Sequence, residues 1–160
     1  MIADGPTHES LRVFHAHLMD TAVEQDRSGI LANINIDSIT TPSGSFDVRS
    51  GAGMHFDVNI SSQTAYSGHF VLEIFTRSGL LVSRSDAQGS PVNLTPGPNR
   101  VSIDIAQMPL LDGVYDVNIG IVDPHGSTVI AWREGAASIQ VTYDGRESGL
   151  VEMGAAIRQQ

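Results

Sequence analysis

The sequence predicts an all-β fold, a sandwich or barrel of about eight short strands preceded by one helix. Apolar and polar residues alternate with a period of two from Ile30 onward, which is the side-chain period of a strand. Gly, Pro, Ser and Asn interrupt the alternation at intervals of about ten residues, as turns between short strands do. The sequence has no strand–helix alternation and no phosphate-binding glycine loop, which argues against a parallel α/β fold.

The amino-terminal helix is predicted over residues 8–23, after a turn signal that ends at Pro6. One narrow apolar stripe recurs along it at helical spacing, formed by Leu11, Phe14 and Leu18. Such a stripe needs cover, from the sandwich, from the same helix of a second protomer or from another domain. Residues 24–29 are polar and have the composition of a linker. The predicted division is therefore a linker helix over 1–28 and a sandwich over 29–160.

The predicted strands follow one another at short intervals: 31–40, 54–61, 69–77, 80–85, 99–105, 113–122, 128–132 and 137–142. Because successive side chains of a strand point to opposite faces, one set from each strand is expected to form the core. These apolar sets are Met54, Phe56, Val58 and Ile60; Phe70, Leu72 and Ile74; Val101, Ile103 and Ile105; and Tyr115, Val117, Ile119 and Ile121. The opposite sets are polar and are expected to meet water or a hydroxyl-rich ligand.

Charge and composition exclude several function classes. The formal net charge is −9 and all nine basic residues are Arg; this balance argues against nucleic acid or an anionic membrane surface as a partner. The chain has no Cys, so disulfides, thiolate metal sites and Cys nucleophiles are ruled out. No apolar run approaches the length of a membrane span, and no signal peptide is recognisable.

Catalytic and metal-binding patterns are weak. The six His residues show no spacing typical of a metal site, so neither a metal nor a cofactor is expected. The Gly-Ser dipeptides lack the Gly-x-Ser-x-Gly frame of a nucleophile elbow. A carbohydrate-active enzyme would need two facing carboxylates, for which Asp57 and Glu73 are the candidates. We expect binding rather than catalysis.

A sugar-binding face is the constellation that the residues favour most. Polar side chains suited to sugar hydroxyls occupy the non-core positions of the strands: His55, Asp57, Asn59, His69, Glu73, Arg77, Asp116 and Asn118. Tyr66 and Trp132 supply flat aromatic groups for the apolar face of a pyranose. The alternative is that the polar residues form the ordinary wet face of an antiparallel sheet, with Trp132 half-buried. We expect one sheet face to bind glycan.

Two stretches carry a resemblance to a known family. A Leu-Leu-x-Gly-x-Tyr entry into a strand occupies residues 110–115, within 109–123, and residues 94–97 precede it. Near the end, the strand over 136–141 is followed by a Gly and two apolar residues at 149–151. Together with a helix that follows residues 2–6, this arrangement resembles the C-terminal domain of the ATPase subunit of O-antigen (O-polysaccharide) ABC exporters.

The resemblance implies an immunoglobulin-like antiparallel β-sandwich that recognises a bacterial surface polysaccharide before export. It also implies a homodimer that can exchange a strand between protomers, an ATP-binding domain upstream of residues 1–28, and a transmembrane permease as partner. The location implied is cytoplasmic, at the inner membrane through the transporter. No Gly-Lys-Ser/Thr phosphate loop occurs in this sequence, so the chain alone is not expected to hydrolyse ATP. The alternatives are a ligand-free dimerisation module and, less favoured, a carbohydrate-active enzyme.

Overall fold

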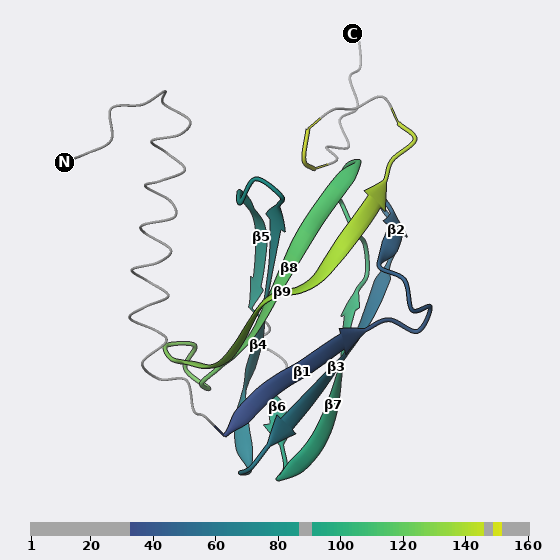
Figure 1. Ribbon diagram of the computed structural model, residues 1–160. Helices are drawn as coiled ribbons and strands as arrows, with labels where there is room; N and C mark the ends of the chain where they lie inside the picture. Colours follow the sequence, from purple (N-terminus) through teal and green to yellow (C-terminus); the bar gives the residue numbers. More distant parts are fainter. Residues whose placement is uncertain (1–32, 87–90, 146–148, 152–160) are drawn as a thin grey trace, which may run out of the picture.

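The computed structural model describes residues 33–86, 91–145 and 149–151, which form two β-sheets packed as two layers (Figure 1). The predicted amino-terminal helix and its apolar stripe lie outside the described residues. The strands are β1 (Ile34–Thr40), β2 (Asp47–Arg49), β3 (Met54–Ser62), β4 (Tyr66–Thr76), β5 (Leu81–Asp86), β6 (Val92–Leu94), β7 (Gly97–Ile105), β8 (Gly113–Val122) and β9 (Val129–Thr142). The prediction of an all-β fold is confirmed.

Sheet A has the strand order β1-β3-β7, and sheet B has the order β2-β9-β8-β4-β5, with β6 paired to β4. All of these pairs are antiparallel except β2 with β9, which is parallel. Strands that are distant in the sequence therefore lie side by side, and each sheet presents one inner face and one outer face.

The core lies between the two inner faces. Phe56 and Val58 of β3 meet Val117 and Ile119 of β8 in one apolar cluster, and all four side chains are at most 1% exposed. Tyr115 closes the end of this core, because its buried hydroxyl donates to the carbonyl oxygen of Leu111 at 2.9 Å. The core positions predicted for β3 and β8 are confirmed.

The strand prediction differs from the structure at several points. The segments 128–132 and 137–142 form one continuous strand, β9. A bulge opposite Asn118 absorbs the intervening residues, and Gly135 N–H donates to Asn118 Oδ1 at 2.9 Å. β2 and β6 were not predicted, because a three-residue strand is too short to show alternation. β4 begins at Tyr66 and ends at Thr76, so Arg77 lies in the following turn.

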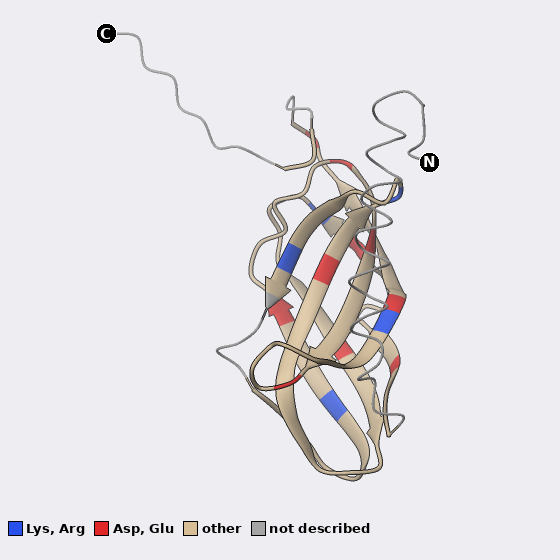
Figure 2. Ribbon diagram, turned by 90° about the vertical axis from the view of Figure 1, so that its left-hand side faces the viewer, with Lys and Arg blue, Asp and Glu red and all other residues tan. Residues whose placement is uncertain are grey.

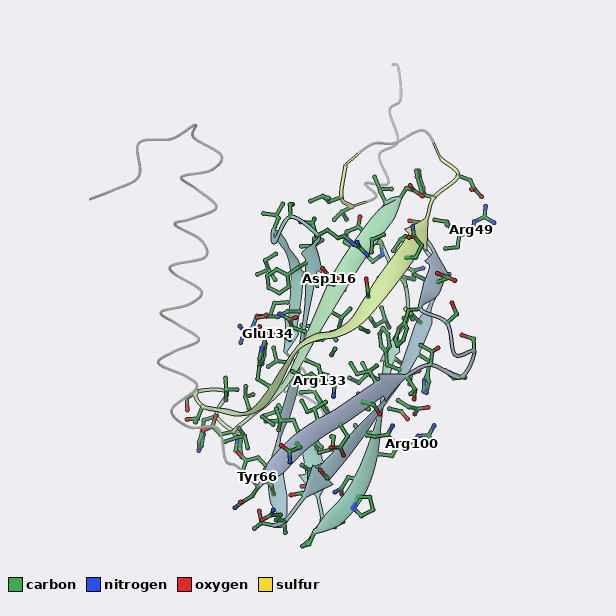
Figure 3. The ribbon with its side chains drawn as sticks, in the orientation of Figure 1. Arg49, Tyr66, Arg100, Asp116, Arg133 and Glu134 are labelled. Atoms are coloured by element: carbon green, nitrogen blue, oxygen red, sulfur yellow. The ribbon has the colours of Figure 1, made fainter. Side chains whose placement is uncertain are left out.

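The two edges of sheet A differ. At β1, a bulge between Ile36 and Ser38 interrupts the register, and Arg133 of β9 donates to the carbonyl oxygens of Ile36 and Asp37. Figure 3 shows Arg133 in the region where β9 approaches β1. At the opposite edge, β7 has β3 as its one strand partner among the described residues. The β7 edge is thus the more open of the two.

No helix within the described ranges is long and apolar enough to cross a membrane.

Candidate functional site

The outer face of sheet B brings several of the predicted site residues together. Across this face Val71 lies opposite Gly120, and Gly120 lies opposite Trp132. In the next row Glu73 lies between Arg84 and Asn118. His69, Glu73, Asp116, Asn118 and Trp132 therefore share one surface, contributed by β4, β8 and β9.

Trp132 forms the centre of this surface. A Cβ atom built at Gly120 would lie only 2.2 Å from Cε3 and 2.6 Å from Cζ3 of Trp132. The benzene ring of the indole therefore lies directly against the backbone of β8, a close approach that only glycine allows. The side chain is half-buried. We call Trp132 on Gly120 the aromatic platform.

Glu73 is a buried carboxylate beside the aromatic platform. It is 5% exposed, and Arg84 Nη1 donates to its Oε1 at 2.9 Å. Burial raises the pKa of Glu73, the Arg84 guanidinium opposes that rise, and Glu134 adds to it. The partner of Glu73 in the next strand, Asn118, has its Oδ1 occupied by Gly135 N–H, so its amide NH₂ is the group left to donate elsewhere.

Two buried polar atoms on the same face have no hydrogen-bond partner among the described residues. They are Nε1 of Trp132 and Nδ1 of His69. The other ring nitrogen of His69, Nε2, donates to the carbonyl oxygen of Pro124 at 3.2 Å, which leaves Nδ1 as an acceptor. One donor and one acceptor of this kind are unusual in a folded protein and call for a partner such as a hydroxyl.

The outer face of sheet A holds the other polar group. Asp57 of β3 lies at the centre of this group and accepts two hydrogen bonds. Arg100 Nη2 donates to its Oδ2 at 2.5 Å, and Ser102 Oγ donates to its Oδ1 at 2.8 Å. The Arg100 hydrogen bond, followed by that of Ser102, lowers the pKa of Asp57 to about 2. Sequence reasoning placed Asp57 in a site but missed Arg100 and Ser102, although both fall on the polar side of the alternating 99–105 segment.

His55 extends this network. Its Nδ1 lies 2.6 Å from Asp104 Oδ1 and its Nε2 lies 3.4 Å from Asp57 Oδ1. The hydrogen bond with Asp104 is the main cause that raises the pKa of His55. Asn59 is likewise occupied, because its Nδ2 donates to Ser38 Oγ at 3.0 Å. The polar side chains of this face therefore find most of their hydrogen-bond partners among one another.

The predicted site residues therefore do not share one face. His55, Asp57 and Asn59 lie on sheet A, whereas the group around Trp132 lies on sheet B. Figure 3 shows the same separation, with Arg100 and Glu134 on opposite sides of the sandwich.

Two predicted residues lie apart from both groups. Tyr66 stands at the beginning of β4, opposite Leu94. Burial, with a smaller contribution from Asp123, raises its pKa. Arg77 is exposed in the turn after β4.

Asp57 and Glu73 cannot act as a facing pair of carboxylates, because they belong to opposite outer faces. This arrangement removes the geometric basis on which a carbohydrate-active enzyme was considered.

Among the residues with described positions, no cluster of three His, Asp or Glu side chains is suited to hold a metal ion. On the side shown in Figure 2, the basic residues form isolated bands along the strands.

An apolar groove separates β7 from β4 and β5. It has a volume of about 730 Å³. Half-buried apolar side chains from both sheets line it, among them Leu72, Val82, Val101, Ile103 and Ile105. Leu72, Val101, Ile103 and Ile105 were predicted as core, but they are only partly covered because the sandwich is open on this side. Val151, at the end of the described chain, also lines the groove.

Comparison with known proteins identifies relatives of this fold. The family model for the Wzt C-terminal domain matches residues 37–153. The crystal structure of the C-terminal domain of wzt superposes with a TM-score of 0.67 at 12% identity, covering 81% of this chain and 86% of that one. A β-glucuronidase of Bacteroides uniformis reaches a TM-score of 0.43 at 13% identity, over 63% of this chain and 14% of the enzyme. No curated protein matches the sequence.

Proposed function

The chain belongs to the Wzt C-terminal domain family, and from this premise we propose that it is a non-catalytic carbohydrate-binding domain of an ABC transporter that exports an O-antigen-like polysaccharide. The family supports the transporter context. The ligand, its binding face and the assembly described below are our proposals.

The aromatic platform is the observation that carries the proposed binding site. A pyranose ring has an apolar face that packs on an aromatic side chain, and its hydroxyls both donate and accept hydrogen bonds. On sheet B the indole of Trp132 packs against Gly120, in the row next to Asn118 and Glu73. Trp132 Nε1 and His69 Nδ1, on the same face, have no hydrogen-bond partner among the described residues. On sheet A, by contrast, Asp57 and His55 are already occupied by neighbouring side chains. The outer face of sheet B is therefore the better candidate.

In the assembled transporter, this domain would follow an ATP-binding domain that works with a transmembrane permease. The glycan would be recognised in the cytoplasm, at the inner membrane. A domain that holds the polymer beside the permease raises its effective concentration there. Such capture would favour transport of the polysaccharides that fit the domain.

Calorimetric titration tests the proposed site. The chain is titrated with the surface polysaccharide of the organism that encodes it, and an unrelated polysaccharide serves as the control ligand. Saturable binding to the cognate polymer is expected, with about tenfold weaker binding in Trp132→Ala. His55→Ala, on the outer face of sheet A, is the matched control and should bind like the wild type. Equal weakening in both variants, or loss only in His55→Ala, would move the site away from sheet B.

The apolar groove favours a second candidate, a dimerisation module. Among the described residues β7 pairs with β3 alone, so its other edge lies open next to half-buried Val101, Ile103 and Ile105, and an added strand is a common way to cover such an edge. Val151 pairs with Leu110 in an antiparallel bridge. We propose that a second copy of the chain covers the groove in a homodimer.

Sedimentation velocity tests the dimer. The wild-type chain should sediment as a dimer, and Ile103→Arg, which places a charge in the groove, should sediment as a monomer. Asn35→Arg is the control, because it puts the same side chain at an exposed position of β1, at the opposite edge of sheet A. A monomeric wild-type chain would eliminate the dimer, whereas a dimer without glycan binding would favour the purely structural function.

A further inference from the structure

Arg84 and Glu73 form an ion pair on the outer face of sheet B. Arg84 Nη1 donates to Glu73 Oε1 at 2.9 Å, and the two side chains come from the neighbouring strands β5 and β4. The carboxylate is buried, with 7% of the side chain exposed, whereas 52% of the Arg84 side chain is exposed. A buried partner therefore holds a guanidinium group that a ligand can reach from solvent.

The ion pair fixes the direction in which Arg84 presents its other donors. A guanidinium is planar and carries five N–H groups in a rigid arrangement. Because Nη1 makes the bond to Glu73, that bond does not use the edge formed by Nε and Nη2. Much of the conformational freedom of this long side chain is already lost in the free protein, so a ligand that binds it has less to order.

The ion pair lies close to the aromatic platform. The indole lies against Gly120 of β8. Gly120 is opposite Val71 of β4, and Glu73 follows two residues later on the same side of β4. One strand spacing of about 5 Å and two residues of about 7 Å together separate Gly120 from Glu73 by about 8 Å. Linked rings of one glycan can cover both groups at this separation.

The other Arg residues described in sheet B and its turns are placed elsewhere. Arg133 turns to the carbonyl oxygens of β1. Arg49 pairs with an exposed Asp at the edge strand β2. Arg77 lies in the turn after β4, four residues and thus about 13 Å beyond Glu73. Within this part of the chain, Arg84 is therefore the guanidinium that can act together with the aromatic platform.

Two oxygen atoms on adjacent carbons suit the remaining edge of Arg84. Hydroxyl oxygens of neighbouring carbons in a sugar ring can accept from Nε and Nη2 at once, as the two oxygens of a carboxylate do. We infer that Arg84, fixed by Glu73, forms a second sugar subsite beside the aromatic platform, which takes a residue with two adjacent free hydroxyls. This inference rests on the proposed function and extends its site from one sugar residue to a linked pair.

An NMR titration with glycan fragments of graded length tests the second subsite. The surface polysaccharide of the source organism is partially hydrolysed, and its monosaccharides and short oligosaccharides are titrated into the intact chain. The wild type should bind the oligosaccharides about tenfold more tightly than the monosaccharides, because only a linked pair fills both subsites. Arg84→Lys keeps the positive charge beside Glu73 but has no planar fork. Its affinity for oligosaccharides should fall about tenfold, and its affinity for monosaccharides should stay unchanged.

Arg49→Lys is the matched control, because it makes the same change in an exposed ion pair at the opposite edge of sheet B. It should bind every fragment like the wild type. Wild-type affinity of Arg84→Lys for oligosaccharides overturns the inference and leaves the aromatic platform standing. Equal losses for monosaccharides and oligosaccharides also overturn it, because Arg84 would then act within the platform itself. A wild-type chain that binds neither the polysaccharide nor its fragments overturns the proposed function as well.

Discussion

Replacing Gly120 with alanine perturbs the aromatic platform without removing any of its groups. The added carbon would lie 2.2 Å from Trp132 Cε3, and ordinary contact begins at 3.4 Å. The indole must therefore move by about 1.2 Å, the difference between these distances. The nearest backbone atom, the carbonyl oxygen of Ala131, lies 3.3 Å from the added carbon and offers little room. We expect the ring to be displaced outward while the sheet keeps its fold.

The expected cost in the free energy of unfolding is about 1 kcal/mol, at the low end for an overpacked site, because a half-buried ring can yield toward solvent. Trp132 is the only Trp in the sequence, so intrinsic fluorescence reports on this ring alone. The emission maximum of Gly120→Ala should shift to longer wavelength, and glycan affinity should fall about tenfold. Urea unfolding gives the stability, and calorimetry gives the affinity.

Ser138→Ala is the control, since it changes an exposed side chain of β9 on the same face without adding an atom. A Gly120→Ala variant with the emission, stability and affinity of the wild type would refute the close contact between Trp132 and β8.

Further predictions concern the core and the network on sheet A. Tyr115→Phe removes the buried hydrogen bond to Leu111 and should lower the free energy of unfolding by about 1 kcal/mol, measured by urea denaturation. The pKa of Asp57 is lowered from 3.8 to about 2, so its stabilisation is present above its unfolded-state pKa and is lost as the pH falls through about 2. The melting temperature of the wild type should thus fall more steeply than that of Asp57→Asn between about pH 4 and pH 2; parallel curves would contradict this. In Asp104→Asn, the raised pKa of His55 should move down toward its ordinary value, which an NMR titration of the imidazole detects.

The alternation of residues was sufficient to predict the all-β fold and much of its core. In β3 and β8 the side chains at alternate positions are buried against the opposite sheet, so the period of two predicts their core residues correctly, although Asp57 and Val122 are buried as well. It failed in β9, where a bulge at Gly135 breaks the period and made one strand look like two. It also overestimated the burial of Ile103, because alternation identifies the inner face of a strand but not whether a neighbouring strand closes the edge.

The sequence predicted which types of residue would form a candidate site, but not which of them share one surface of the sandwich. Asp57 and Glu73 both occupy polar positions of alternating strands, and such a pattern is identical for the two sheets of a sandwich. Only the pairing of the strands assigns them to opposite faces. The importance of Gly120 was likewise hidden, since its role depends on Trp132, which lies opposite in the neighbouring strand. Long-range register is not encoded in any local spacing.

The indole N–H signal of Trp132 provides the most direct measurement of carbohydrate binding on sheet B. Because the sequence has one Trp, a nitrogen–proton correlation spectrum contains one such signal. On titration with the cognate surface polysaccharide, this signal should shift saturably, together with the backbone signals of Gly120 and Asn118. A signal that stays in place while the residues around His55 and Arg100 shift would contradict the assignment to sheet B. A spectrum without any change would contradict carbohydrate binding itself.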